Sequence, residues 1–382
     1  KASVGSQGND GIGSYRYTDT YSISNNEGKI AVAFNTKGNE KITWETNTNI
    51  NAGVDFELFG RKLTGSAEYF YRKTSDMLFW FSVPQSLGYN GYYDNIGDMR
   101  NAGVEFSLNY NIINTEHLAW SVNANLTHYK NKILRLPKER KTTTTKAEGY
   151  EGYATGNKFV GEGLPINTFY IYKYAGVDKT DGLPMWYMEN EVEKDGKKIT
   201  ERITTKEYSK ATQYICADTT PKAYGGFGTS LELYGFDFSV QCTYSIGGKT
   251  YDSGYANLVT NPSGTPGGSF HKDVLKAWTP ENKDSDFPRF VYQDKNITSA
   301  SDRFLVDASY LNIQNAQIGY TLPASLVHKA KLGSVRIYAT CDNIWYWSRR
   351  KGLDPRYSFT GETNYASNSP VRTISGGIRL TF

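Results

Sequence analysis

The chain has 382 residues, with 43 basic and 39 acidic side chains, a formal net charge of +4 and a mean hydropathy of −0.57. The charges are scattered along the sequence, so they indicate no nucleic-acid partner. No run approaches the roughly 18 to 20 consecutive apolar residues that a membrane-spanning helix needs. A transmembrane β-barrel is compatible with this hydropathy, because its strands alternate apolar with polar residues. Aromatic residues make up 14% of the chain, which favours a protein at a boundary between membrane and water.

Period-two alternation of apolar and polar residues predicts β-strands along the whole chain. In chain order we expect twelve strands, over residues 1–7, 42–58, 63–82, 100–112, 119–131, 166–177, 183–190, 223–233, 236–247, 303–321, 334–344 and 372–382. The clearest segment, from Phe236 to Ile246, is long enough to cross a bilayer as a tilted strand. The polar positions carry mostly Asn, Ser, Thr and Gln, whereas the outer face of a soluble sheet would be rich in Lys and Glu.

The connections between these strands alternate in length. Short ones span residues 59–62, 113–118, 178–182, 234–235 and 322–333, and long ones span 6–41, 82–99, 132–165, 191–222, 248–302 and 345–371. Bacterial outer-membrane barrels have this parity, because their periplasmic turns are short and their external loops are long. The parity predicts that the last strand runs toward a periplasmic C-terminus, with lipid-facing Ile374, Ile378, Leu380 and Phe382, and lumen-facing Ser375, Arg379 and Thr381.

Four local features complete the strand prediction. The alternation changes phase within 311–320, which predicts a bulge near Gln314 and Asn315. The strand at 183–190 is short and depends mainly on the parity of the connections. The only helix that we expect in the connection 248–302 covers 272–278, before a proline. If the chain is part of a larger barrel, its first strand near Val4 should not pair with its last strand near Ile378.

Patterns that would indicate catalysis or metal binding are weak. The four histidines are far apart, and the three cysteines have the spacing of neither a zinc site nor a disulfide framework. Asp178, Asp181 and Gly182 resemble the start of a calcium loop, but the ligand-rich sequence and terminal Glu are missing, so a hairpin turn is preferred. We therefore expect no catalytic residue, no metal and no cofactor, and a protein that is not an enzyme.

Aromatic residues in the long connections are the best candidates for substrate binding. They are Trp80, Tyr89, Tyr92 and Tyr93 around the connection 82–99, and Trp345 and Trp347 after the strand 334–344. Sugar rings stack their C–H faces on such side chains. The competing interpretation is an aromatic girdle at the membrane interface, which we prefer for the two tryptophans because they lie directly at a strand end.

Several short motifs occur along the chain in a fixed order. They are Lys1–Gly5 with Gln7–Asn9, Asn101–Phe106, Thr220–Lys222 with Gly225 and Gly226, Tyr234–Val240, Tyr310–Ile313 with Gly319–Pro323, Arg336–Tyr338 with Asn343, and Gly352–Pro355. This ordered set resembles the SusC/RagA family of TonB-dependent outer-membrane transporters. Arg356 departs from the family pattern, which often has an acidic residue after Asp-Pro.

The resemblance implies an all-β fold, an antiparallel transmembrane β-barrel of about 22 strands with a plug in its lumen. Residues 1–382 would supply about 12 strands from the C-terminal part of the barrel, and the plug domain and N-terminal strands would be absent from this chain. The implied function is active import of oligosaccharides, or of peptides, across the outer membrane of a Gram-negative cell. The implied partners are a SusD-like surface lipoprotein, outer-membrane lipid, and the TonB–ExbB–ExbD energy-coupling system, which would act through the missing N-terminal region.

Two functions of other classes stay open. A passive porin would have the same kind of strands, a constriction loop and no plug. A secreted carbohydrate-binding β-sandwich or adhesin would also alternate, but it would stay in water without detergent.

Overall fold

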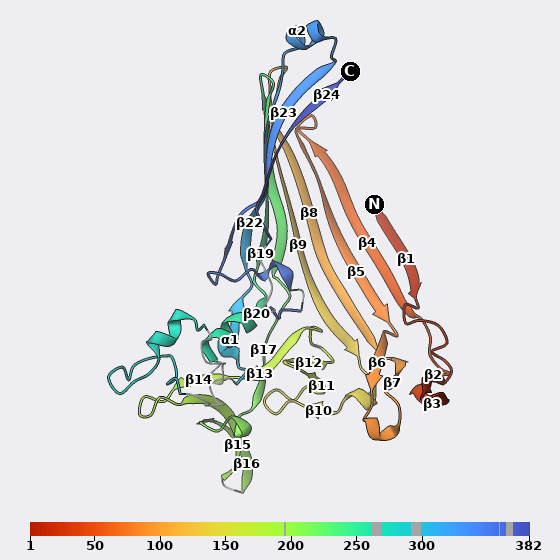
Figure 1. Ribbon diagram of the computed structural model, residues 1–382, viewed down its shortest axis with the longest axis vertical. Helices are drawn as coiled ribbons and strands as arrows, with labels where there is room; N and C mark the ends of the chain where they lie inside the picture. Colours follow the sequence, from red (N-terminus) through yellow and green to blue (C-terminus); the bar gives the residue numbers. More distant parts are fainter. Residues whose placement is uncertain (195, 261–268, 292–298, 359, 364–369) are drawn as a thin grey trace.

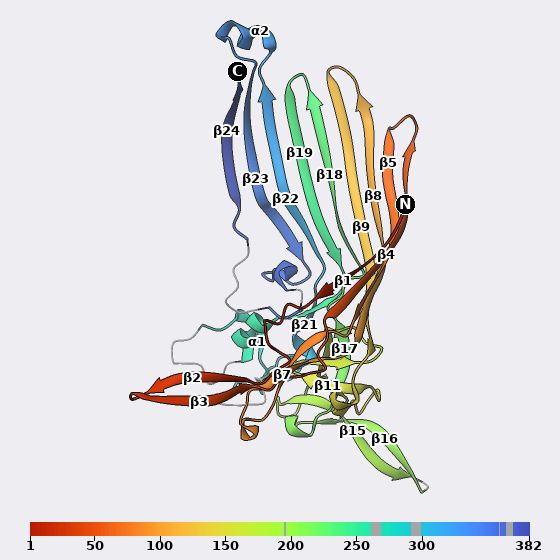
Figure 2. The same cartoon turned by 90° about the vertical axis from the view of Figure 1, so that its right-hand side faces the viewer.

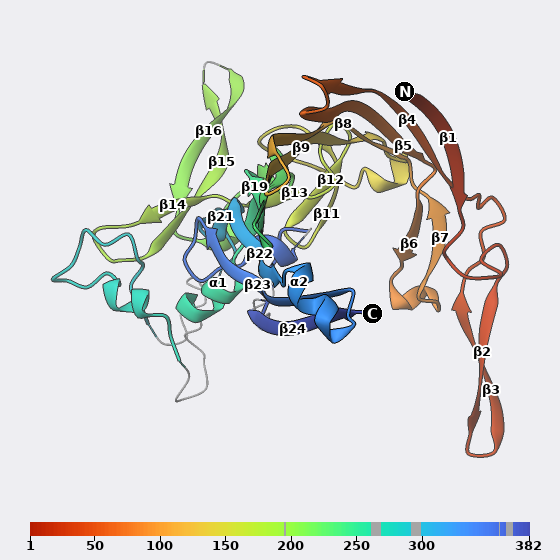
Figure 3. The ribbon, with the colours of Figure 1, turned by 90° about the horizontal axis from the view of Figure 1, so that it is seen from above.

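The dominant feature of the structure, a computed structural model, is one antiparallel sheet of ten strands (Figure 1). The structure describes residues 1–194, 196–260, 269–291, 299–358, 360–363 and 370–382. The ten strands are, in spatial order, β1 (Ala2–Asn9), β4 (Glu45–Leu58), β5 (Leu63–Ser75), β8 (Asp98–Asn114), β9 (Leu118–Arg135), β18 (Ala223–Leu233), β19 (Phe236–Ile246), β22 (Tyr310–Thr321), β23 (Ser334–Ser348) and β24 (Thr373–Thr381). We call this sheet the wall, because it curves like part of a barrel (Figure 3).

The two faces of the wall differ in chemistry, as the alternation predicts. Phe238 of β19 pairs with Ile318 of β22 on one face, and in the next row Ser239 pairs with Gln317 on the other. Ile318 is 54% exposed and Phe238 is 40% exposed. Side chains on the convex face of a curved sheet spread apart and those on the concave face converge, so the exposed apolar face is the convex one and the polar face is the concave one.

The wall is open, with β1 at one edge and β24 at the other. The prediction that the strand near Val4 does not pair with the strand near Ile378 is therefore confirmed. On β24, Ile374, Ile378 and Leu380 lie on the apolar face, because Ile378 pairs with Ile337 and Arg379 pairs with Arg336 of the polar face. Phe382 follows the strand and is 91% exposed.

The short connections between wall strands lie at the end of the wall that holds the C-terminus, and the long ones lie at the opposite end (Figure 2). The predicted two-residue turn between β18 and β19 is tight because Tyr234 and Gly235 both have positive φ, 48° and 87°, as a twist-matched hairpin turn requires. The longest of the short connections contains helix α2 (Ala324–Val327). The parity of the connections is thus confirmed for the wall.

The prediction of twelve barrel strands is wrong by two. Residues 166–177 and 183–190 contain β13 (Thr168–Tyr172), β14 (Tyr174–Val177) and β15 (Pro184–Lys194), which belong to smaller sheets beyond the wall. A hairpin inside a long loop has the same alternation of apolar and polar residues as a hairpin of the barrel. Counting its two strands as barrel strands also leaves the alternation of short and long connections unchanged everywhere else. Alternation and parity therefore could not separate the two cases.

The long connections form sheets of their own. β13 joins β10 (Thr143–Thr144), β11 (Glu151–Thr155), β12 (Lys158–Gly161) and β17 (Gln213–Asp218), while β14 and β15 join β16 (Lys197–Thr205). Three separate two-stranded sheets are β2 (Thr20–Asn26) with β3 (Lys29–Thr36), β6 (Leu78–Ser82) with β7 (Gly91–Asn95), and β20 (Lys249–Tyr251) with β21 (Leu305–Asp307).

The largest buried cluster lies among these connections instead of on the wall. Phe169 and Ile171 of β13 pack with Val259 of helix α1 (Ser253–Thr260) and with Phe304, and all four are at most 2% exposed. The backbone of Tyr251 in the same cluster donates a hydrogen bond to Gly361 from the connection between β23 and β24. Three consecutive long connections thus share one core, which we call the loop core.

The structure confirms the bulge and changes the helix prediction. Gln314 has no partner in the pairing of β22 with β19, which passes from Ile313 to Asn315. The expected helix at 272–278 is a 3-10 helix, Lys272–Lys276, and α1 was not predicted. Other 3-10 helices are Gln85–Leu87, Lys138–Arg140, Tyr208–Lys210, Asp302–Phe304, His328–Ala330 and Pro355–Tyr357. Within the described ranges, no helix has both the length and the apolar character to cross a bilayer.

Candidate functional site

A cavity of about 390 Å³ lies where the concave polar face of the wall meets the long connections. Its wall side is formed by Asn101 of β8, Tyr129 and Asn131 of β9, Tyr224 of β18, Ser245 of β19 and Tyr310 of β22. Its other side is formed by Ile166, Asn167, Thr219, Thr220, Pro221, Gly247, Ala308, Pro355, Arg356 and Ser358. Five wall strands and three long connections therefore build one cavity.

Strand register places the wall residues together. Tyr224 pairs with Ser245, and Ser245 pairs with Tyr310, so these three side chains form a row across three strands. The ring of Tyr129 meets the ring of Tyr224 edge-on, with the centroids 6.2 Å apart. The three tyrosines thus line the same side of the cavity.

An amide pair attaches a loop to this wall. Asn131 Nδ2 donates a hydrogen bond to Asn101 Oδ1 at 2.8 Å, and Asn131 Oδ1 accepts one from the backbone N–H of Ile166 at 2.7 Å. The loop segment that closes the cavity near Ile166 is therefore held by a side chain whose position the strand fixes.

Arg356 is the one charged side chain among the described residues that line the cavity. Its Nε and Nη2 donate hydrogen bonds to the two carboxylate oxygens of Asp354, at 2.8 and 2.6 Å. The side chains of Arg356 and Asp354 are 13% and 5% exposed. The guanidinium also lies 5.0 Å from the ring centroid of Tyr346 on β23. Bidentate pairing with a buried carboxylate compensates the positive charge of Arg356.

The chemistry of the cavity is that of a site for a largely neutral, oxygen-rich ligand. Aromatic rings offer faces to C–H groups, and amides and hydroxyls offer both donors and acceptors. No described group of three or more His, Cys, Asp or Glu side chains is arranged to hold a metal ion. The arrangement supports binding by stacking and hydrogen bonding.

The four predicted aromatic residues around the connection 82–99 lie elsewhere, at the β6–β7 hairpin. Trp80 packs edge-on against Tyr93 at 5.1 Å between ring centroids, and Tyr92 stacks on Phe81 at 5.2 Å. Tyr89 packs against Phe34 of β3. None of these residues lines the cavity. They form a separate aromatic group, and their contact with a substrate stays a prediction.

An arginine completes this aromatic group. The guanidinium of Arg140 lies 3.2 Å from the ring centroid of Phe81 and 5.5 Å from that of Tyr153. Burial lowers the pKa of Arg140 and raises the pKa of Tyr92 and of Tyr153. The side chains are therefore held in a partly buried stack between the hairpin and the connection after β9.

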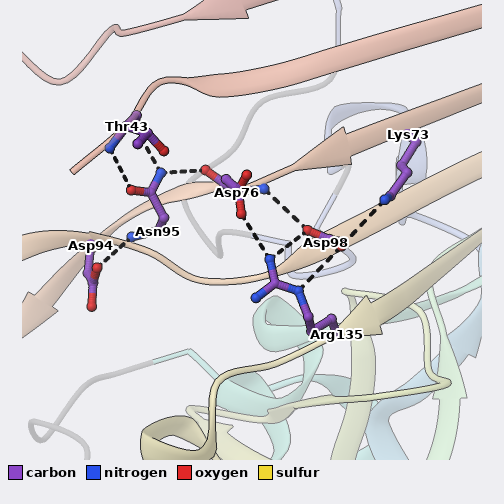
Figure 4. A network of polar contacts seen from close by, with 7 residues as sticks. All are labelled: Thr43, Lys73, Asp76, Asp94, Asn95, Asp98 and Arg135. Atoms are coloured by element: carbon purple, nitrogen blue, oxygen red, sulfur yellow. Dashed lines mark hydrogen bonds and ion pairs between the residues drawn. The ribbon is translucent and has the colours of Figure 1, made fainter. Parts of the chain in front are cut away.

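A polar network anchors the base of the same hairpin (Figure 4). Arg135 Nη2 at the end of β9 donates to Asp76 Oδ1 at 2.9 Å and to Asp98 Oδ1 at 3.0 Å. Asn95 Nδ2 donates to the backbone carbonyls of Asp76 and Thr43, at 2.7 and 2.8 Å. These contacts join the hairpin to the ends of β4, β5, β8 and β9, and they fix its direction relative to the wall.

The predicted residues Trp345 and Trp347 lie on the apolar face of β23, opposite Ile313 and Leu311 of β22. They are 50% and 44% exposed, and the cavity lies on the other face of the wall. This position favours the interfacial girdle over substrate contact.

The two carboxylates of the turn at Asp178 and Asp181 are both paired with the side chain of Lys206. Lys206 Nζ lies 2.6 Å from Asp178 Oδ2 and 2.9 Å from Asp181 Oδ2. The hydrogen bond from Lys206 is the main cause that lowers the pKa of Asp178 to about 2. Gly182 has a φ of +73°, so the preferred hairpin turn is confirmed, between β14 and β15.

The cavity residues were not recognised as a group from the sequence. Their signal is weak but present. Tyr129, Tyr224 and Tyr310 occupy polar-face positions near the long-loop ends of their strands, and the other polar-face residues of these strands are mostly small or amide-bearing. Arg356 was noted only for its departure from the motif pattern, because its pairing with Asp354 requires the folded loop.

Comparison with known proteins places the chain in a family. Residues 6–375 match the family model for the TonB dependent receptor-like β-barrel. The chain belongs to this family. The predicted resemblance to SusC/RagA-type receptors and the all-β barrel fold are thereby confirmed.

Similar proteins support the same assignment. TonB-dependent receptor P3 of Formosa agariphila is 29% identical over 398 residues, which cover all of this chain and 39% of the relative. TonB-dependent receptor SusC of Bacteroides thetaiotaomicron is 27% identical and matches 83% of this chain and 30% of its own length. The solved structure of the RagAB peptide transporter matches with a TM-score of 0.84 and 27% identity, over all of this chain and 40% of that one. The chain thus spans about two fifths of the receptors that it matches over its whole length.

Proposed function

We propose that this chain forms part of the barrel wall of a SusC-like outer-membrane transporter that imports oligosaccharides. The observation that carries this proposal is the cavity on the concave face, which combines three tyrosines with amide and hydroxyl groups and has one charge-compensated arginine. Family membership supports transport, and the apolar convex face suits contact with outer-membrane lipid.

The ten wall strands are then somewhat less than half of a barrel of about 22 strands, and the remaining strands and the plug come from residues outside this chain. The short turns and the C-terminus face the periplasm, and the long connections face the cell exterior. A SusD-like surface lipoprotein covers the external end, and TonB with ExbB and ExbD supplies energy from the periplasmic side. This set of partners follows from the likeness to SusC and to RagAB.

A peptide substrate is the second candidate, because the structure of the RagAB peptide transporter matches the whole chain. A peptide backbone also offers carbonyl and N–H groups to the asparagines of the cavity. A charged peptide terminus, however, would find no uncompensated charge among the described lining residues. The cavity therefore favours the oligosaccharide.

Uptake of labelled neutral oligosaccharides and of labelled peptides by cells that produce the full-length protein tests the proposal. Uptake of oligosaccharide is expected to stop when TonB is deleted. Tyr224→Ala should weaken oligosaccharide binding about two- to twelvefold, since a stacking contact contributes about 0.5 to 1.5 kcal/mol. Tyr110→Ala is the matched control, because Tyr110 is 40% exposed on the apolar face and Tyr224 is 38% exposed on the polar face.

Three results would contradict the proposal. Uptake that persists without TonB would indicate a passive porin. Uptake of peptides alone would favour the second candidate. A native protein that stays in water without detergent would indicate a secreted sandwich.

A further inference from the structure

The charge of the cavity depends on one side chain that does not line it. Arg356 lines the cavity, and Asp354 is 5% exposed and lies behind Arg356, outside the lining. Asp354 occupies two guanidinium donors, Nε and Nη2, through both of its carboxylate oxygens. A positive side chain therefore faces the cavity while its nearest countercharge is built into the loop.

This arrangement acts differently on neutral and on acidic ligands. A carboxylate on a ligand could reach only those guanidinium donors that Asp354 leaves, and it would be repelled there by the negative charge of Asp354. A neutral sugar has no such conflict, because Asn101, Asn131 and the tyrosine hydroxyls recognise uncharged oxygens.

We propose that Asp354 is a specificity-determining residue, which makes the cavity select uncharged oligosaccharides over acidic ones by neutralising Arg356. The inference rests on the proposed oligosaccharide function and deepens it. It also gives a role to the position where the sequence departs from the motif pattern, since an acidic residue at 356 would leave two neighbouring carboxylates without this cation.

The pair also has a structural role, which the test must separate from specificity. Asp354 Oδ1 accepts a hydrogen bond from the backbone N–H of Arg356 at 3.2 Å and caps the 3-10 helix Pro355–Tyr357. Asp354→Asn keeps the acceptor oxygen and the side-chain volume and removes the charge. The substitution therefore retains the cap while it removes the negative charge that lies beside Arg356.

A second bidentate pair in the same wall provides a matched control. Asp237 of β19 accepts from Nε and Nη2 of Arg336 of β23, at 2.8 and 2.5 Å. Neither residue lines the cavity. Asp237→Asn thus unmasks an arginine on the same polar face without changing the cavity.

The experiment measures binding to the purified full-length protein by calorimetry. The probes are a panel of neutral hexasaccharides and the same panel oxidised at C6 to uronic acids. The wild-type protein should prefer the neutral panel, and Asp354→Asn should shift the ratio of the two affinities about tenfold toward the acidic panel. Asp237→Asn should keep the wild-type ratio.

A second variant keeps the test valid if Asp354→Asn does not fold. Arg356→Gln leaves the carboxylate of Asp354 without its cation, and should weaken acidic binding about threefold or more relative to neutral binding.

The inference alone is overturned if Asp354→Asn binds the neutral panel and keeps the wild-type ratio of affinities. The same result in Arg356→Gln overturns it where only that variant folds. A wild-type preference for the oxidised panel overturns it as well. Binding of peptides with no binding of either sugar panel overturns the proposed function together with the inference.

Discussion

Gly319 allows an ion pair to bridge two strands that are not neighbours. Asp237 of β19 and Arg336 of β23 meet above β22, at the position where Gly319 has no side chain. A methyl group at Gly319 would lie 2.5 Å from Asp237 Oδ1 and 2.6 Å from Arg336 Nη2, well inside contact distance. Gly319→Ala should therefore displace both side chains and break the pair.

The expected loss follows from the burial of the pair. Hydrogen bonds between charged groups contribute about 1.5 to 3 kcal/mol each when they are shielded, and much less when they are exposed. The two side chains are 21% and 24% exposed, so the free energy of unfolding should fall by about 1 to 3 kcal/mol in total. Gly376→Ala is the matched control, because the nearest atom to its added methyl is 3.8 Å away.

The assay is the temperature at which the full-length barrel loses its resistance to unfolding in dodecyl sulfate, followed by gel migration. Gly319→Ala should lower this temperature by a few degrees, and Gly376→Ala should not. In a double-mutant cycle with Asp237→Asn, the two losses should not add, because either substitution breaks the same pair. Equal midpoints for the two alanine variants, or fully additive losses, would refute the reasoning.

Three further predictions concern the loops and the apolar face. Burial lowers the pKa of Lys158 from 10.5 to about 8. Between pH 8 and pH 10.5 the folded loops therefore bind fewer protons than the unfolded chain, and the stability of the loops should rise with pH. Lys158→Met should abolish this rise in calorimetric melts. Lys206 lowers the pKa of Asp178 from 3.8 to about 2, so the pair of Asp178 with Lys206 stabilises the loop above pH 3.8, and this stabilisation is lost as the pH falls toward 2. In Lys206→Met, pepsin cleavage of the loop should begin at a higher pH than in the wild-type protein. Trp345→Ala should reduce the amount of folded protein in the membrane fraction and leave oligosaccharide affinity unchanged, and a loss of affinity with normal assembly would return this residue to the substrate candidates.

The sequence predicts the wall well because its information is local. Alternation over Phe236–Ile246 assigns the faces of a strand without knowledge of any neighbour, and the phase change beside Gln314 marks the bulge by itself. The same local signal misassigned 166–177 and 183–190, since a loop hairpin and a barrel hairpin alternate alike.

The cavity could not be predicted in this way, because its members are distant in the chain. Tyr129 and Tyr224 meet through the pairing of β9 with β18, across about a hundred residues that fold into the loop sheets. Asp354 and Arg356 are close in sequence, but only the folded loop turns the arginine toward the wall. Register between strands and the conformation of long connections are the missing information.

The loop core has a consequence for the construction of chimaeras. Phe169, Val259 and Phe304 come from different stretches of two long connections, and a third connection is tied to them where Lys158 Nζ donates to the carbonyl of Thr360 at 2.6 Å. Grafting one such connection from another receptor would leave large apolar side chains without their packing partners. Losing the contacts of one buried phenylalanine lowers the free energy of unfolding by about 3 to 5 kcal/mol. The three connections should therefore be exchangeable between receptors only as a set, while the strands that carry them remain in place.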